Sequence, residues 1–271
     1  GEFLLWSLCA KDESLRFAVT LAPKNPEEKP HYERWVAYVK DKALPVEFEY
    51  GKNFSNIGDI FASAKCLGTT SITEGFGLAF LEPWLANRPL IGRDLPEISQ
   101  DFKDEGIDLS HLYQSLPVPL EIFDRRKLSE KIEESLKASY RAYGRECSEA
   151  IRRKTIQSLC ARDEIDFACL DETLQRQALD VIGASKELKK GFGHIVFTLP
   201  RAEILTENRR LIKEKYSMEQ MTERLLEVYR AVEETVVSSK DGKDEEDLKS
   251  SVLEQFLAPH RFKLLKSAAP R

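Results

Sequence analysis

The stretch SITEGFGLAFLEP, residues 71–83, places two glycines and two glutamates around the start of an apolar run. Gly75 and Gly77 are positions where the backbone can approach a ligand closely, because glycine has no side chain. Glu74 directly precedes them, and Glu82 follows within the apolar run. Backbone N–H groups of such a loop at the start of a helix suit a phosphate or diphosphate. The stretch therefore predicts a ligand-binding loop between a strand and a helix.

Short apolar segments alternate with helical patterns on both sides of this loop. The strand-like segments are 16–23, 45–51, 65–71 and 88–93, and the helical patterns are 2–10, 26–44, 54–64 and 77–87. This alternation is typical of parallel βαβ units. It predicts an α/β fold with a Rossmann-like doubly wound parallel sheet. Ligands of such sheets bind beyond the carboxyl ends of the strands, where the 71–77 loop is expected to lie.

From about residue 120 the pattern becomes mainly helical. Residues 124–159 and 171–190 are charged and strongly helical, and HIVFTL (194–199) is the strand-like exception. We expect these helical residues to form an insertion that covers the core rather than a module that binds a partner, because amphipathic helices normally face their own core. We divide the chain into a Rossmann-like core (1–119), a mainly helical insertion (120–200), closing helices of the core (201–236), and a polar linker and tail (237–271).

The composition is that of an ordinary globular protein. Of 271 residues, 42% are hydrophobic and 32% are charged, and the net charge is −5. Nucleic acid is not expected as the main partner, because a phosphate-binding surface usually makes a domain basic. The five cysteines are scattered and lack a C-x-x-C pair, which indicates reduced thiols and a cytoplasmic protein. The sequence predicts neither a transmembrane segment nor a metal site, since the four histidines lack ligand spacing.

Residues 73–97, TEGFGLAFLEPWLANRPLIGRDLPE, resemble the nucleotide-sugar-binding motif of the retaining GT-B glycosyltransferases. This group 1 family includes relatives of glycogen synthase. In the family motif a strand ends in Ser, a Glu-Gly-Phe-Gly loop follows, and a second Glu comes after seven intervening residues. The positions that match are Ser71, Glu74, Gly75, Phe76, Gly77, Glu82 and Pro89.

The resemblance implies transfer of a hexose from a nucleotide-diphosphate sugar, such as a UDP- or GDP-hexose, with retention of anomeric configuration. It implies no metal and no further cofactor. Glu74 would be the catalytic-site carboxylate that holds hexose hydroxyls, and Glu82 would bind the ribose hydroxyls. Asn53, in a loop after another strand, would lie near the base. The remaining donor-binding positions are Ser71, Gly75, Phe76, Gly77 and Leu78.

The resemblance also implies parts that these residues do not supply. In the family, a basic pair that grips the diphosphate precedes the helix matching residues 2–10, and an N-terminal acceptor domain lies further upstream. We therefore expect the chain to be the donor-binding half of a longer enzyme that is poorly active or inactive alone. The sequence does not identify the acceptor.

Other interpretations compete with this one. A glycoside hydrolase also uses two carboxylates but does not need a glycine loop at a helix start. A non-catalytic nucleotide-binding or scaffolding module with the same fold is the more serious alternative. Glu82 could be a solvated helix residue, but its apolar neighbours predict a buried carboxylate with a partner. Arg93 and Asp94 could contact a ligand or form a structural salt bridge, and Trp35 and Trp84 are expected in the core.

Overall fold

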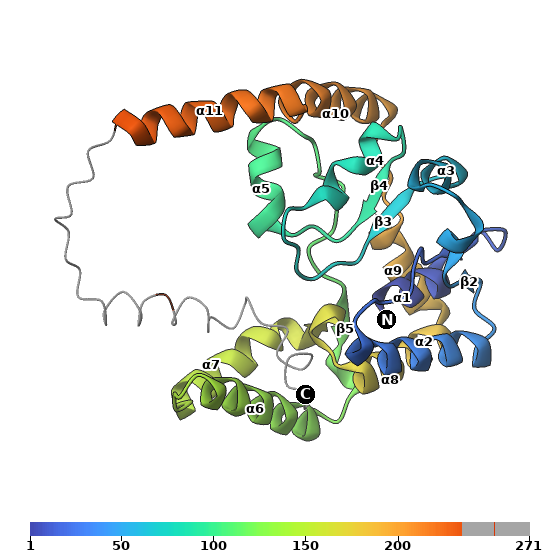
Figure 1. Cartoon of the computed structure of the whole chain (residues 1–271). Coiled ribbons are helices and arrows are strands. Elements are labelled where there is room, and N and C mark those ends of the chain that lie inside the picture. Colours follow the sequence, from blue (N-terminus) through green and yellow to red (C-terminus); the bar gives the residue numbers. More distant parts are fainter. Residues whose placement is uncertain (235–251, 253–271) are drawn as a thin grey trace. The chain divides into compact units, whose positions relative to one another are not determined.

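The computed structural model describes residues 1–234 and Val252, which form two compact units (Figure 1). Unit 1 comprises Gly1–Val118 and Glu172–Ile212, and the described part of unit 2 comprises Pro119–Asp171, residues 213–234 and Val252. The helices within 172–200 therefore belong to unit 1 with the core, whereas the sequence assigned them to the insertion. The predicted linker and tail (237–271) lie outside the described residues, apart from Val252.

The first part of unit 1 alternates helices with short strands, as predicted. Its α-helices are α1 (Glu2–Cys9), α2 (Lys29–Asp41), α3 (Ile57–Ser63), α4 (Glu82–Leu85) and α5 (Pro96–Asp104). Its strands are β1 (Phe17–Ala18), β2 (Val46–Glu47), β3 (Leu67–Thr69) and β4 (Leu90–Gly92), and its 3-10 turns are η1 (Pro26–Glu28), η2 (Tyr50–Asn53) and η3 (Leu78–Phe80). Helix α3 begins where the Asn56 side chain accepts a hydrogen bond from the Asp59 amide, as a helix cap does.

The strands of unit 1 form parallel pairs. β1 pairs with β2, and β3 pairs with β4 so that Thr69 lies opposite Gly92. A parallel bridge between Arg93 and Tyr113 continues directly after β4. The α/β class is therefore confirmed. The union of these short pairs into one doubly wound sheet stays a prediction.

Helix α1 packs against α8 (Glu172–Ala184) and α9 (Lys186–Val196). The predicted strand HIVFTL is wrong, because α9 continues to Val196 and residues 197–199 form no strand. Phe192, Gly193 and Val196 are buried in α9 at helical spacing. A Cβ on Gly193 would lie 2.8 Å from the Cys9 carbonyl oxygen, so the glycine permits the close contact with α1. Tertiary packing on α1 thus overrides the local strand pattern.

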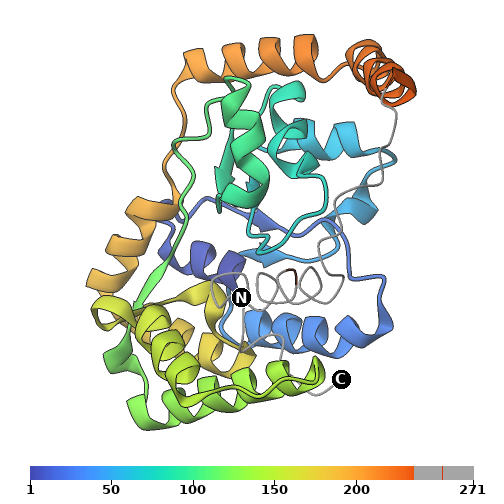
Figure 2. The same cartoon turned by 90° about the vertical axis from the view of Figure 1, so that its left-hand side faces the viewer.

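Unit 2 is mainly helical, as predicted for this part of the chain. Helix α6 (Arg125–Ala142) begins at Asp124, whose carboxylate accepts hydrogen bonds from two backbone amides. Its buried residues include Leu128, Ile132 and Leu136, spaced by four residues as an amphipathic helix requires. Helix α7 (Glu149–Leu159) packs beside α6 (Figure 1 and Figure 2).

The remaining elements complete the described chain. β5 (Pro117–Pro119) and α10 (Ala202–Lys215) cross the divisions between the units. The others are η4 (Leu120–Ile122), η5 (Ala161–Asp163), β6 (Glu164–Asp166), η6 (Phe167–Cys169) and α11 (Met218–Glu234). Within residues 1–234 and Val252, every helix is too short or too polar to cross a membrane.

We expect Gly92→Ala to destabilise unit 1. Gly92 has φ +128°, and a Cβ there would lie 2.1 Å from the Thr69 carbonyl oxygen on the paired strand. Backbone strain and the clash together should lower the free energy of unfolding by about 2–4 kcal/mol. Gly191→Ala is the matched control, because the exposed Gly191 in α9 has open space around it. Equal thermal melting temperatures for the two variants would contradict the prediction.

Candidate glycosyl donor site

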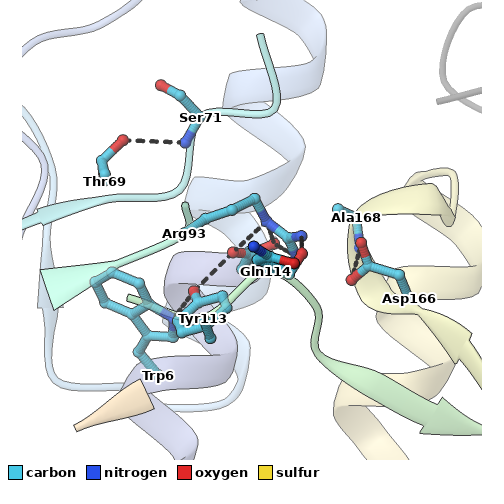
Figure 3. A network of polar contacts seen from close by, with 9 residues as sticks. Trp6, Thr69, Ser71, Arg93, Tyr113, Gln114, Asp166 and Ala168 are labelled. Carbon is cyan, nitrogen blue, oxygen red and sulfur yellow. Dashed lines mark hydrogen bonds and ion pairs between the residues drawn. The ribbon is translucent and has the colours of Figure 1, made fainter. Parts of the chain in front are cut away.

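The glycine loop, residues 71–77, leaves the carboxyl end of β3, as predicted. β3 ends at Thr69, whose carbonyl oxygen accepts a hydrogen bond from the Arg93 amide at 2.9 Å. The Ser71 amide donates to Thr69 Oγ1 at 3.3 Å (Figure 3). These contacts fix the base of the loop against the end of the strand pair. Beyond Ser71 the loop contains neither helix nor strand until η3 begins at Leu78.

The two glycines of the loop have different roles. Gly77 has φ +73°, and a Cβ there would lie 2.4 Å from Ile98 Cγ2 of α5, so packing and backbone conformation both require glycine. Nothing lies within 4 Å of a Cβ built on Gly75. The Phe76 side chain between them is 87% exposed, and Leu78 is 56% exposed. The loop therefore presents an aromatic ring and open backbone at the surface.

Glu74 and Glu82 have different environments. Glu74 is half-buried on the loop, and Glu82 is exposed. The predicted helix at 77–87 is interrupted: η3 ends at Phe80 and α4 begins at Glu82, next to Pro83, a residue suited to a first helical turn. Glu82 is therefore in the first turn of α4. The expectation of a buried Glu82 carboxylate with a partner is wrong, because water solvates the exposed group.

The glycine loop leads into two short helical turns rather than into the longer helix predicted at 77–87. η3 contains three residues and α4 contains four. A helix dipole sums over many aligned peptides, so such short turns supply little of it. Donors for an anion would have to come from the backbone amides of the loop itself.

Asn53 lies after β2, as predicted, but on a separate loop. Its Nδ2 donates to Glu47 Oε1 at 3.2 Å, and the neighbouring Lys52 pairs with Glu49 at 2.7 Å. In the described residues, no hydrogen bond or ion pair joins residues 51–54 to the glycine loop. Five of the predicted site residues therefore lie on the glycine loop, Leu78 begins η3, and Glu82 begins α4: the five are Ser71, Glu74, Gly75, Phe76 and Gly77. The role of Asn53 stays a prediction.

Arg93 is buried in a polar network and is 1% exposed. Its Nη2 lies 2.7 Å from Glu2 Oε2, and its Nη1 donates to the Gln114 carbonyl oxygen at 2.7 Å. The Tyr113 hydroxyl donates to Glu2 Oε1 at 2.7 Å and accepts from Trp6 Nε1 at 2.9 Å. Figure 3 shows Tyr113 between Trp6 and Arg93. Burial, followed by the nearby Glu2 carboxylate, raises the pKa of Tyr113 far above its usual range.

Asp94 is also buried, and two side chains of α5 contact its carboxylate. Ser99 Oγ donates to one of its carboxylate oxygens, and Lys103 Nζ lies 2.7 Å from the other. Of the two interpretations of Arg93 and Asp94, the structural salt bridge fits the geometry. Both side chains anchor the segment after β4.

The sequence missed Glu2 and Tyr113 as organising residues. The available signal was Glu2 itself, a single carboxylate at the start of the otherwise apolar run EFLLWSLC. A charge in such a run needs a buried partner. Nothing in the local pattern identifies that partner, because Arg93 is 91 positions away.

Trp84 of α4 is buried and packs against the His111 ring. Trp84 is fully buried and donates through Nε1 to the Phe80 carbonyl oxygen at 2.8 Å. The His111 ring lies edge-on to Trp84, and its Nε2 is 2.8 Å from the Leu90 carbonyl oxygen. A carbonyl only accepts, so this nitrogen carries the proton. Burial lowers the pKa of His111, despite the opposing effects of the Leu90 hydrogen bond and the charge on Asp108.

Comparisons with known proteins give no match to a protein-family model, a curated protein or a solved structure. Among the described residues, no three His, Cys, Asp or Glu side chains are placed to hold a metal ion.

We expect Arg93→Met to lower the free energy of unfolding by about 3–5 kcal/mol, because it leaves the Glu2 carboxylate buried without its ion pair. Chemical denaturation measures this change. Arg126→Met is the control, since Arg126 and its partner Glu130 are mainly exposed, and such pairs contribute little. Similar small losses in both variants would show that the Glu2–Arg93 pair is not a structural anchor.

Acidification should lower the free energy of unfolding of the wild-type protein, partly through protonation of His111 on unfolding. Its folded-state pKa lies below the ordinary value of 6.5, so below that pH the unfolded chain binds more protons and stability falls. His111→Gln keeps a donor for the Leu90 carbonyl but cannot titrate. Chemical denaturation at pH 7 and pH 5 should show that the free energy of unfolding falls less between these pH values in this variant than in wild type. His194→Gln, at an exposed position, should retain the full loss.

Proposed function

We propose that unit 1 is the nucleotide-sugar-binding domain of a retaining GT-B glycosyltransferase with a Rossmann-like core. The observation that carries the proposal is the position of the glycine loop. It follows a parallel strand at its carboxyl end, where ligands of α/β sheets bind, and it presents open backbone at Gly75. The Glu-Gly-Phe-Gly sequence with the second Glu at position 82 supplies the match to the donor motif.

The exposed groups of the loop suit the parts of a nucleotide-diphosphate sugar. Glu74 would accept hydrogen bonds from hexose hydroxyls, and the amides of residues 75–78 would face the diphosphate. Glu82 is exposed and would accept from the ribose hydroxyls. Backbone donors held in place before the reaction would stabilise the charge that develops on the departing diphosphate. The loop base, fixed through Thr69, supports such preorganisation.

The chemistry proposed for the chain is what the resemblance to retaining GT-B glycosyltransferases implies. Retaining transfer breaks the bond between the anomeric carbon and the diphosphate oxygen and forms a bond from the same face to the acceptor hydroxyl oxygen. The acceptor proton passes to the departing phosphate oxygen. No protein nucleophile is needed, and a carboxylate near the hexose assists by orienting it. The acceptor and the base of the nucleotide are not specified by the loop.

Calorimetric titration with UDP, GDP, ADP and their glucose or mannose conjugates tests the proposal. We expect one nucleotide to bind and its sugar conjugate to bind more tightly. Glu82→Ala should weaken binding of the free nucleotide by more than about 1 kcal/mol, roughly fivefold in the dissociation constant, through loss of a charge-assisted hydrogen bond. Glu74→Ala should instead remove the advantage of the sugar conjugate.

Glu33→Ala is the matched control, because this exposed glutamate lies on α2 outside the loop. It should bind like wild type. Absence of binding to every nucleotide and conjugate, both in this chain and in a chain extended upstream to include the basic pair, would refute the donor-site assignment. Binding that is unaffected by both loop variants would place the nucleotide elsewhere. Tight nucleotide binding without any advantage for a sugar conjugate would favour the non-catalytic nucleotide-binding module.

A further inference from the structure

Helix α11 carries an unusual surface stripe. Six apolar side chains, each at least 51% exposed, recur at intervals of three and four residues or side by side: Met218, Met221, Leu225, Val228, Tyr229 and Val232. At about 100° per residue they fall within roughly 100° of the helix circumference. We call this set the α11 stripe. Such a stripe normally faces a partner.

The described residues do not bury this stripe. Every residue from Met221 to Val232 is exposed. A helix of 17 residues without packing is marginal in water, because most helical stability in proteins comes from burial of the apolar face. The stripe is also larger than the scattered apolar residues of an ordinary surface. It requires an apolar cover.

We propose that the α11 stripe is the docking surface for residues 252–266 of the same chain, which we call the tail segment. Its sequence, VLEQFLAPHRFKLLK, contains seven large apolar residues. It also contains one glutamate against three basic residues, so its net charge is +2 with histidine neutral. The sequence of α11 contains five glutamates against two arginines, for a net charge of −3. The two segments are therefore complementary in both apolar content and charge.

The length of the intervening chain permits this docking. Residues 235–251 separate α11 from Val252 and can span at most roughly 60 Å when extended. The axis of α11 is about 25 Å long. The tail segment can therefore reach any part of the stripe. A tether of this kind also gives an effective concentration in the millimolar range, so weak contacts suffice.

A second copy of α11 fits the stripe less well. The helix is shorter than the roughly three heptads that a coiled coil usually needs. Two α11 helices would also bring together two segments of the same negative charge. The tail segment avoids both problems. It is the occupant to which the proposal commits.

Amide hydrogen exchange of the full chain tests the proposal at residues 221–232. We expect Phe256→Ser combined with Leu257→Ser to raise the exchange rate there by about tenfold or more, since the helix loses its cover. These changes lie in the tail segment and leave α11 intact. Asp241→Ser combined with Gly242→Ser, in the intervening chain, is the matched control and should exchange like wild type. Protection should also be the same across a tenfold range of protein concentration.

Three results would overturn the proposal. The first is rapid exchange at 221–232 in the wild-type chain, which would mean that nothing covers the stripe. The second is protection that persists in the tail variant at every concentration, which would assign the cover to another part of the chain. The third is protection that rises with concentration together with a dimer mass in sedimentation, which would assign the stripe to a second copy.

Discussion

The buried ion pair between Glu2 and Arg93 is the interaction on which the organisation of unit 1 depends. It joins helix α1 to the end of β4, two segments far apart in the sequence. Its desolvation cost is offset by further hydrogen bonds, from the Tyr113 hydroxyl to Glu2 and from Arg93 to the Gln114 carbonyl. The Arg93 amide also bonds to Thr69. One buried network thus fixes the carboxyl ends of the paired strands β3 and β4.

This arrangement separates the support of the glycine loop from its exposed tip. The base is held at Thr69 and Ser71, and Gly77 is wedged against α5. Between these points Gly75 and Phe76 face open space or solvent. Binding loops on a rigid scaffold combine such a fixed base with accessible groups. Arg93 and Asp94 therefore contribute by positioning the scaffold, although the sequence pattern also allowed them a direct role.

Local sequence patterns predicted the elements that depend on local forces. The helical pattern from residue 124, where α6 forms, is one example, and the position of the glycine loop after β3 is another. The patterns failed where contacts between segments far apart in the sequence determine the local structure. Residues 194–196 continue α9 because Gly193 packs on the backbone of Cys9. The pairing of Glu2 with Arg93 could not be predicted, because periodicity carries no information about segments this far apart.

Glu82 shows a second limit, which concerns burial. Its neighbours Leu81, Pro83 and Trp84 are all buried, yet Glu82 is exposed. Successive residues on a helical turn point about 100° apart, so apolar neighbours in sequence can all face the core while one side chain faces water. A solvated carboxylate exchanges water for ligand hydroxyls and gains only about 1 kcal/mol or somewhat more. Donor affinity would then depend mainly on the loop backbone, which makes its fixed base the more important feature.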